Sequence, residues 1–252
     1  MGDLVDTKAP PSISVLGRAS DLLSSFRPGE SNVSLSELAR RTGLPKATAH
    51  RLTGELVRLG FLERQGYGLR LGVRLFELGS HAPGPQTLRT SAAPAIMHLS
   101  ATTRLTVHLG ILDGSQVVYI DKRNGGTPLP GLPTAIGSRM PAHATALGKA
   151  LLAVIRDDLP RDLPRLTPHT VVERRRLEAM LDEVRSRGLA FDRQEARIGF
   201  ECVASVIYGR CGEPIGALSL CGPVGSFDAD AQAGAVLTAA ASVSAGLPRR
   251  SA

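Results

Sequence analysis

The stretch SLSELARRTGLPKATAHRLTGEL, residues 34–56, decides the fold of the N-terminal part of the chain. Ser34 and Glu37 have the spacing of a capping box, in which two side chains satisfy backbone amides at the start of a helix. Gly43 is suited to the left-handed residue that ends a helix, and Pro45 to the first position of the next one. The stretch therefore predicts two short helices with the inward-facing residues Leu35, Leu38, Ala39, Ala47, Ala49, Leu52 and Leu56.

Two helices joined by a turn of three or four residues with glycine form a helix-turn-helix motif. Four positions match the small residue, the turn glycine and the two buried positions that this motif requires: Ala39, Gly43, Ala49 and Leu52. An ordinary helical hairpin is the alternative, but it does not require all four. The helix that begins at Pro45 is thus expected to be the recognition helix of a DNA-binding domain.

The neighbouring segments complete this domain. Residues 59–64 and 67–71 are expected to be strands joined by a tight turn at Gln65-Gly66, and a β-hairpin directly after the second helix is typical of a winged helix. We place this winged helix-turn-helix domain at residues 10–73. A helix over residues 12–26 is expected to pack under the motif with Val15, Leu16, Ala19, Leu22, Leu23 and Phe26.

Positive charge is concentrated in the same domain. The formal net charge of the chain is +7, and residues 40–74 hold eight Lys or Arg side chains against two Glu side chains, a net +6. A basic patch on a helix-turn-helix is typical of polyanion binding with steep salt dependence, whereas a solvated charged face is the alternative. For His50, the alternative to DNA contact is a half-buried position in which the side chain packs against its own domain. The residues expected to contact DNA are Lys46, Thr48, His50, Arg51, Arg64 and Arg70.

The second half of the chain predicts a domain of the α+β class. Pro83-Gly84-Pro85 cannot continue a helix, so we expect a linker at 74–86, containing a helix that begins at Val73, and a second domain at 87–249. Hairpins and flanking helices indicate an antiparallel sheet covered by helices. The expected helices are 87–103, 143–155, 173–187 and 228–246, and the expected strands are 106–112, 116–121, 189–192, 201–209 and 214–221.

Catalytic and metal-binding motifs are missing from the sequence. We find no nucleophile elbow, no zinc-binding HExxH helix and no paired catalytic carboxylates, and Gly148-Lys149 lacks the remaining residues of a phosphate-binding loop. His108 and Asp121 lie on adjacent expected strands, where a satisfied surface pair is favoured. The sequence predicts no enzyme activity, no metal and no cofactor.

Cysteine usage and hydropathy indicate the compartment. Cys202, Cys211 and Cys221 are an odd number at wide spacing, which disfavours a disulfide framework or zinc site and fits a reducing environment. The N-terminus lacks the apolar core of a signal peptide. Residues 231–248 favour a buried amphipathic helix over a membrane span. We expect a soluble, cytoplasmic protein without a membrane partner.

The start of the helix expected at 143–155 is a candidate anion site. Free amides from about His143 to Thr145 point outward at such a terminus and can hold the carboxylate of a small acid. Cys202 and Cys221, by contrast, are by their residue type alone expected to be small buried hydrophobes.

Several long motifs follow one another along the chain, of which GSRMPAHATALGKA at residues 137–150 is the most specific. The others are residues 44–52, 67–72, 112–114, 118–122, 188–192, 199–204 and 216–223. In content and order these motifs, from about Val15 to Pro223, resemble the isocitrate lyase regulator (IclR) family of bacterial transcription factors.

The resemblance implies a winged helix-turn-helix, a linker helix and a GAF-like C-terminal domain that binds a small metabolite, often an organic or aromatic acid. It also implies a homodimer or homotetramer on a palindromic double-stranded DNA operator, with a repressor among the expected roles. Carried over by motif, the effector-binding residues are Leu129, Leu132, Ala146, Leu147, Asp192, Cys202, Ser219 and Cys221.

Two features depart from the family pattern. Cys221 stands where a hydroxyl is common, and Pro83-Gly84-Pro85 interrupts the region of the linker helix. The alternative function is that of a small-molecule sensor or enzyme of GAF-like fold whose winged helix binds a protein. The missing catalytic residues and the basic segment disfavour it.

Overall fold

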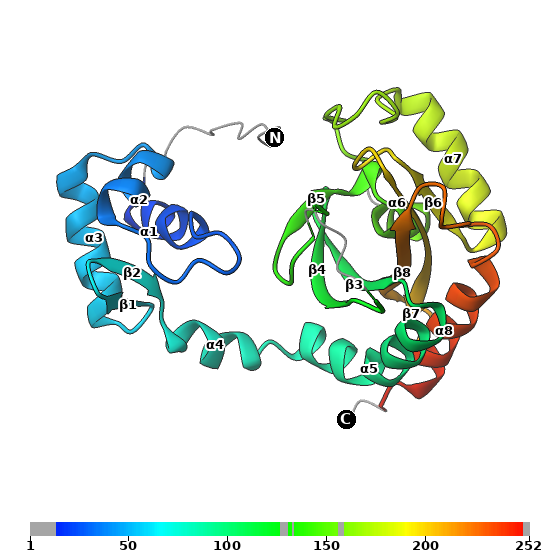
Figure 1. Ribbon diagram of the computed structural model, residues 1–252, viewed down its shortest axis with the longest axis horizontal. Helices are drawn as coiled ribbons and strands as arrows, with labels where there is room; N and C mark the ends of the chain where they lie inside the picture. The colour runs from blue at the N-terminus through cyan, green and yellow to red at the C-terminus, as the bar shows by residue number, and fades with distance from the viewer. Residues whose placement is uncertain (1–13, 127–130, 133, 156–158, 249–252) are drawn as a thin grey trace. The chain divides into compact units, whose positions relative to one another are not determined.

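The computed structural model describes residues 14–126, 131–132, 134–155 and 159–248. Its internal contacts divide the chain into two compact units, Met1–Ala82 and Pro83–Ala252, and Figure 1 shows the elements of each unit. The predicted α+β class is confirmed, because the first unit is mainly helical and the second is built on one antiparallel sheet.

The N-terminal unit is a winged helix-turn-helix. Its elements are α1 (Val15–Ser24), α2 (Leu35–Thr42), α3 (Lys46–Arg58), β1 (Leu62–Gln65), β2 (Gly68–Leu71) and α4 (Val73–Ser80). Leu22, Leu38 and Leu62 are almost completely buried at its centre. The core joins the three helices to the hairpin through Leu22, Val33, Leu38, Ala39, Leu44, Ala49, Leu52, Leu56, Leu62 and Leu69.

The helix ends follow the local sequence signals with two differences. Ser34 Oγ accepts the amide of Glu37 over 3.2 Å, and Gly43 ends α2 in the left-handed conformation at φ 71°. The Glu37 carboxylate does not complete the capping box, because it binds Arg40 and Arg41 instead. Pro45 precedes the first turn of α3, so its expected place inside the helix is wrong by one residue.

Three residues expected to be inside are exposed. Ala47 faces solvent on α3, and Val15 and Leu16 face solvent on α1. The apolar pattern of α1 extends beyond the part of the helix that meets the core, because only its second half packs against α2 and α3.

The wing contains one more extended segment than the sequence predicts. β1 and β2 pair from Leu62 with Leu71 to Gln65 with Gly68, so the turn is Gly66-Tyr67 rather than Gln65-Gly66. Val33 and Leu69 exchange backbone hydrogen bonds of 2.8 and 2.9 Å, which attaches the segment before α2 to the hairpin.

The C-terminal unit begins at a helix where the sequence predicts a break. α5 (Pro83–Thr103) starts with Pro83-Gly84-Pro85. The expected interruption is present but shorter than predicted: only His81 and Ala82 separate α4 from α5. Proline in a first helical turn loses no hydrogen bond, so α5 begins four residues before residue 87.

A six-stranded sheet forms the middle layer of this unit. Its order is β5-β4-β3-β8-β7-β6, and all neighbouring strands are antiparallel. The strands are β3 (Thr106–Asp113), β4 (Gln116–Arg123), β5 (Arg139–Pro141), β6 (Ala190–Arg193), β7 (Phe200–Tyr208) and β8 (Pro214–Pro223). All five expected strands are confirmed, and the short β5 is additional.

Helices cover both faces of the sheet and form two apolar cores. One core joins the sheet to α6 (Ala146–Val154) and α7 (Arg174–Arg187). The other joins it to α5 and α8 (Ala233–Gly246), which also contact each other. No helix among the described residues is long and apolar enough to cross a membrane.

The motif of residues 137–150 folds as two helical pieces instead of the expected continuous helix. A 3₁₀ turn, η1 (Ala142–Ala144), precedes α6, and Thr145 between them caps α6 by accepting the amide of Gly148 over 3.0 Å. A Cβ atom on Gly148 would lie 2.2 Å from the carbonyl oxygen of Ala142. Glycine at this position therefore lets the two pieces pack closely.

Candidate functional site

The outer face of α3 and the hairpin carry the side chains predicted to contact DNA. Lys46, His50 and Arg51 are exposed on α3, and Thr48 is half-buried beside them. Arg64 on β1 and Arg70 on β2 are also exposed. The packing alternative for His50 does not hold, because its side chain faces solvent.

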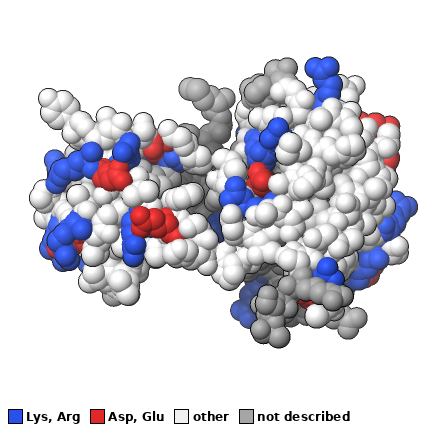
Figure 2. All heavy atoms as spheres, turned by 90° about the horizontal axis from the view of Figure 1, so that it is seen from below, with Lys and Arg blue, Asp and Glu red and all other residues white. Residues whose placement is uncertain are grey.

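Ion pairs within the unit neutralise much of the charge that the sequence concentrates there. Of the eight basic residues between 40 and 74, five pair with glutamates. Three of these glutamates, Glu30, Glu37 and Glu77, lie just outside that segment, so the +6 for residues 40–74 becomes +3 for residues 30–77. On the face of the N-terminal unit shown in Figure 2, carboxylates lie against the cations.

Lys46, Arg51 and Arg64 are the basic residues of this segment that form no ion pair with any described residue. Arg70 differs from them, since its Nη2 lies 2.6 Å from Glu63 Oε2. Glu63 also accepts the amide of Val73, and these hydrogen bonds lower the pKa of its carboxyl. The uncompensated positive charge thus lies at the start of α3, in its second turn and on the first wing strand.

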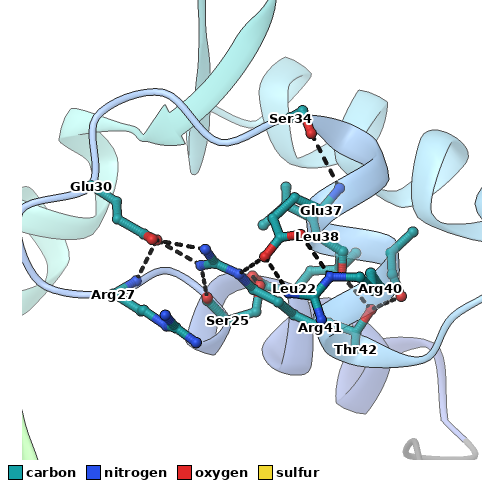
Figure 3. A network of polar contacts seen from close by, with 11 residues as sticks. Leu22, Ser25, Arg27, Glu30, Ser34, Glu37, Leu38, Arg40, Arg41 and Thr42 are labelled. Carbon is teal, nitrogen blue, oxygen red and sulfur yellow. Dashed lines mark hydrogen bonds and ion pairs between the residues drawn. The ribbon is translucent and has the colours of Figure 1, made fainter. Parts of the chain in front are cut away.

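Arg41 has a structural role inside the motif. Its side chain is only 13% exposed, and its guanidinium donates to Glu30, to Glu37 and to the carbonyl oxygen of Ser25 over 2.6 to 2.8 Å (Figure 3). The hydrogen bond from Arg41 lowers the pKa of Glu30 to about 2. This network ties the end of α1 and the following loop to α2, and it removes Arg41 from the DNA-facing set.

A cavity lies in the C-terminal unit where the sheet meets the start of α6 and the loop between β6 and β7. Its free volume is about 20 Å³, room for a single water molecule. Leu129 lies outside the described residues. The seven other residues predicted to bind an effector all line this cavity: Leu132, Ala146, Leu147, Asp192, Cys202, Ser219 and Cys221.

His108 projects from β3 into the cavity, contrary to the predicted surface pair with Asp121. It is 2% exposed, and its Nε2 lies 2.9 Å from Thr134 Oγ1. Lys122, not Asp121, lies opposite it in the strand register. Burial lowers the pKa of His108 to about 3, so the imidazole is neutral at physiological pH.

Asp192 is the carboxyl group that lines the cavity, and its surroundings hold it close to neutrality. Burial raises its pKa to about 7. Its Oδ1 accepts the amides of Glu195 over 2.7 Å and of Ala196 over 3.3 Å. Lys149 and Glu195 form a buried ion pair behind it. Asp192 can therefore accept a hydrogen bond from a ligand or, when protonated, donate one.

Two cysteine thiols lie side by side in the wall. Cys202 on β7 is directly opposite Cys221 on β8. Hydrogen bonding to Cys221, together with burial, raises the pKa of the Cys202 thiol. Protonated thiols are poor nucleophiles and metal ligands, and the described residues contain no group of three metal-binding side chains.

The helix terminus expected to hold a carboxylate is displaced by three residues. The amide of Thr145 donates to Ala142 within the 3₁₀ turn, so the stretch from His143 to Thr145 is not the free terminus. The amides of Ala146 and Leu147 open α6 and have no acceptor inside the helix. Both residues line the cavity.

Eight further residues line the cavity, and only Thr145 among them belonged to a site expected from the sequence, the anion site at the helix start. The seven that sequence reasoning did not assign are His108, Tyr119, Thr134, Met140, Ala196, Arg197 and Phe200. The ring of Tyr119 meets that of His108 edge-on, with centroids 5.3 Å apart. The Asp113-Gly114 signal gave the hairpin of β3 and β4, and the register of that hairpin could have placed both rings near one face. Thr134 and Arg197 lie on loops and left no periodic signal.

Comparison with protein families matches both units. The model described as "Bacterial transcriptional regulator IclR C-terminal" matches residues 82–245, and the model described as "IclR helix-turn-helix domain" matches residues 15–66. Together they span most of the chain.

Named relatives give the same result. The HTH-type transcriptional regulator KdgR of Dickeya chrysanthemi is 33% identical over 231 residues, covering 88% of this chain and 75% of its own length. The acetate operon repressor of Salmonella typhimurium is 33% identical over 218 residues, covering 82% of this chain and 79% of its own length. These relatives are named as regulators of transcription rather than as enzymes.

Solved structures share the architecture. An IclR homolog from Microbacterium hydrocarbonoxydans, complexed with 4-hydroxybenzoate, has a TM-score of 0.83 at 27% identity and covers 93% of this chain and 99% of its own. The Thermotoga maritima IclR has a TM-score of 0.73 at 28% identity, covering 92% and 98%. With both family models and these relatives in agreement, the chain belongs to the IclR family of transcriptional regulators, with an N-terminal helix-turn-helix for DNA and a C-terminal effector-binding domain.

Proposed function

We propose that the cavity of the C-terminal unit binds a small organic acid and that this binding changes the affinity of the protein for its operator. The observation that carries the proposal is the cavity itself, which is lined by six motif residues from separate segments and by Leu132 of the loop before β5. The amides of Ala146 and Leu147 at the start of α6 receive the carboxylate, since a helix N-terminus favours an anion. Ser219 and Asp192 bind the remaining polar groups.

DNA is contacted in this proposal by α3 in the major groove and by the wing beside it. Lys46, Thr48, His50 and Arg51 face the base edges and phosphates, and Arg64 binds the backbone. Arg70 contacts DNA only if its ion pair with Glu63 breaks. The ion pairs support this assignment of roles. Lys46, Arg51 and Arg64 form no ion pair with any described residue, whereas Arg70 pairs with Glu63.

The same proposal assigns the active species as a homodimer, or a tetramer of two such dimers, on a palindromic operator. Every residue of α4 is at least partly exposed, and Val73 and Phe76 are 62% and 76% exposed. Apolar side chains exposed to this degree on one short helix are typical of an interface. A second copy of the chain covers α4 and aligns two recognition helices on two half-sites.

Residues 10–73 are the DNA-binding part in this scheme, 74–86 the linker and 87–249 the effector-binding part. The effector acts as a population shift between arrangements of the two DNA-binding parts. It can move that equilibrium only by its difference in affinity for the two arrangements.

Thermal unfolding in the presence of a library of carboxylic and aromatic acids tests the proposal. An acid at 100 times its dissociation constant stabilises the folded state by about 2.7 kcal/mol. Asp192→Asn and Ser219→Ala should reduce the shift caused by a hit, and the hit should change the affinity for duplex DNA. A shift of full size in both variants would overturn the assignment of the cavity.

A further inference from the structure

The cavity carries one cationic side chain that the proposed function does not use. Of the described residues that line it, only Arg197 bears a full positive charge near neutral pH, because His108 is neutral there. Asp192 is the one lining carboxyl, and Lys149 behind it is already paired with Glu195.

Arg197 lies on the loop between β6 and β7, at the edge of the cavity. Its guanidinium crosses over Gly131, where an added Cβ atom would lie 3.0 Å from Nη2. Gly131 has φ 82°, so both its backbone and its missing side chain suit this crossing. The guanidinium forms no ion pair or side-chain hydrogen bond with any described residue.

Arg193, four residues earlier in the chain, differs from Arg197 because its guanidinium is paired. Its Nη2 lies 2.8 Å from Asp230 Oδ2, and its guanidinium stacks 5.0 Å from the centre of the Phe191 ring. Arg193 is thus neutralised and does not line the cavity. Arg197 lines the edge of the cavity as a solvent-exposed residue, without a counter-charge among the described residues.

We propose that Arg197 is a specificity-determining residue that binds a second anionic group of the effector. The effector is then a dicarboxylic acid, an inference that rests on the proposed function. One carboxylate lies at the start of α6, and the guanidinium holds the other. A guanidinium matches a carboxylate with two parallel hydrogen bonds, stronger than those between neutral groups. The free volume of about 20 Å³ is too small for a dicarboxylate, so the proposal requires Arg197 and Leu132, which both stand on loops, to move apart when the acid binds.

Matched acids of equal carbon count test this inference by calorimetric titration of the full chain. The pairs are adipate with hexanoate and 1,4-benzenedicarboxylate with 4-methylbenzoate. The wild type should bind a dicarboxylate about tenfold or more tightly than its monocarboxylate partner. Arg197→Gln should abolish that preference while keeping the monocarboxylate affinity, and Arg197→Lys should keep part of it. Arg193→Gln, the control, should behave as the wild type.

Three results would overturn the inference. The preference for dicarboxylates could be absent from the wild type, it could persist in Arg197→Gln, or Arg197→Gln could weaken both acids of a pair equally. In each case acids still bind, and the proposed function stands. If no acid of either kind binds and none stabilises the protein, the proposed function fails and this inference fails with it.

Discussion

The amide of Glu195 donates a hydrogen bond to Asp192 Oδ1 over 2.7 Å, while the Glu195 side chain pairs with the buried Lys149. This hydrogen bond holds Asp192 in the wall of the cavity, close to the buried ion pair of Lys149 with Glu195. Burial dominates over the attraction of Lys149, and the pKa of Asp192 rises to about 7.

Effector affinity should therefore depend on pH through Asp192. An anionic effector binds beside a protonated carboxyl more favourably than beside a carboxylate. Affinity should fall as pH rises above 7, by up to about tenfold per pH unit. Calorimetric titration with a bound acid at pH 6, 7 and 8 measures this. Asp192→Asn can still accept the amide of Glu195, and its affinity should be flat over that range.

The stability of the folded state should also respond to this group. Its folded pKa is raised above the ordinary aspartate value of 3.8, so the unfolded chain ionises first as pH rises. The contribution of Asp192 to stability is present below about pH 4 and is lost as pH approaches 7. A loss of stability of equal size in Asp192→Asn over this range would contradict the assignment.

Arg41 should be far more important for folding than its neighbour Arg40. Arg41→Ala leaves Glu30 and Glu37 without their shared partner in a partly buried site, which should destabilise the N-terminal unit by about 1–3 kcal/mol. Arg40 is 70% exposed, so Arg40→Ala should cost much less than Arg41→Ala. Urea unfolding followed by circular dichroism compares the two, and equal costs would show that the network in Figure 3 does not support the motif.

Glycine at position 148 should be required by the contact between η1 and α6. Gly148→Ala places a methyl group against the carbonyl of Ala142 and should destabilise the C-terminal unit by about 2 kcal/mol or more. The matched control is Gly234 in α8, which has open space around it. Gly234→Ala should leave stability unchanged or raise it by up to about 0.5 kcal/mol. A mild effect of both changes, measured by urea unfolding, would refute the steric argument.

The exposed side of α4 should govern the oligomeric state. Phe76→Glu puts a charge where a second copy packs in our proposal, and it should shift the protein toward monomer in sedimentation velocity. Leu59, 49% exposed at the end of α3, provides the control, and Leu59→Glu should keep the wild-type state. An unchanged oligomer in Phe76→Glu would place the interface elsewhere.

Local signals in the sequence were sufficient for most of the fold. The cap at Ser34, the left-handed Gly43 and the Asp113-Gly114 turn act through neighbours a few residues away, and each was predicted correctly in type. Pro83-Gly84-Pro85 correctly indicated a break between two helices, but the prediction missed that these residues form the first turn of the second helix, because proline disrupts a helix interior but suits its first turn.

Features that depend on distant partners could not be read from local patterns. Arg70 resembles Arg51 in the sequence, and only the folded position of Glu63 shows that Arg70 is paired. The contact of Arg41 with Glu30 likewise depends on the fold, whereas its i,i+4 pair with Glu37 is local. The cavity shows the same limit. Family motifs supplied residues such as Asp192 and Ser219, whereas Arg197 lies on a loop outside the residues that the resemblance assigned to effector binding.

The most direct measurement of the central claim is the affinity for duplex DNA as a function of salt. Three unpaired cations per protomer give six in a dimer, and the slope of log affinity against log salt should be about −5. A triple variant should lose most of that salt dependence, so that its slope is close to zero. It combines Lys46→Gln, Arg51→Gln and Arg64→Gln. The control combines Arg40→Gln, Arg58→Gln and Arg74→Gln, which removes as many charges from residues already paired with glutamates.

The control should keep nearly the wild-type slope. If the two triple variants lose salt dependence equally, or if the wild type binds duplex DNA with an affinity that does not change with salt, the unpaired cations of α3 and the wing do not form the DNA-binding surface.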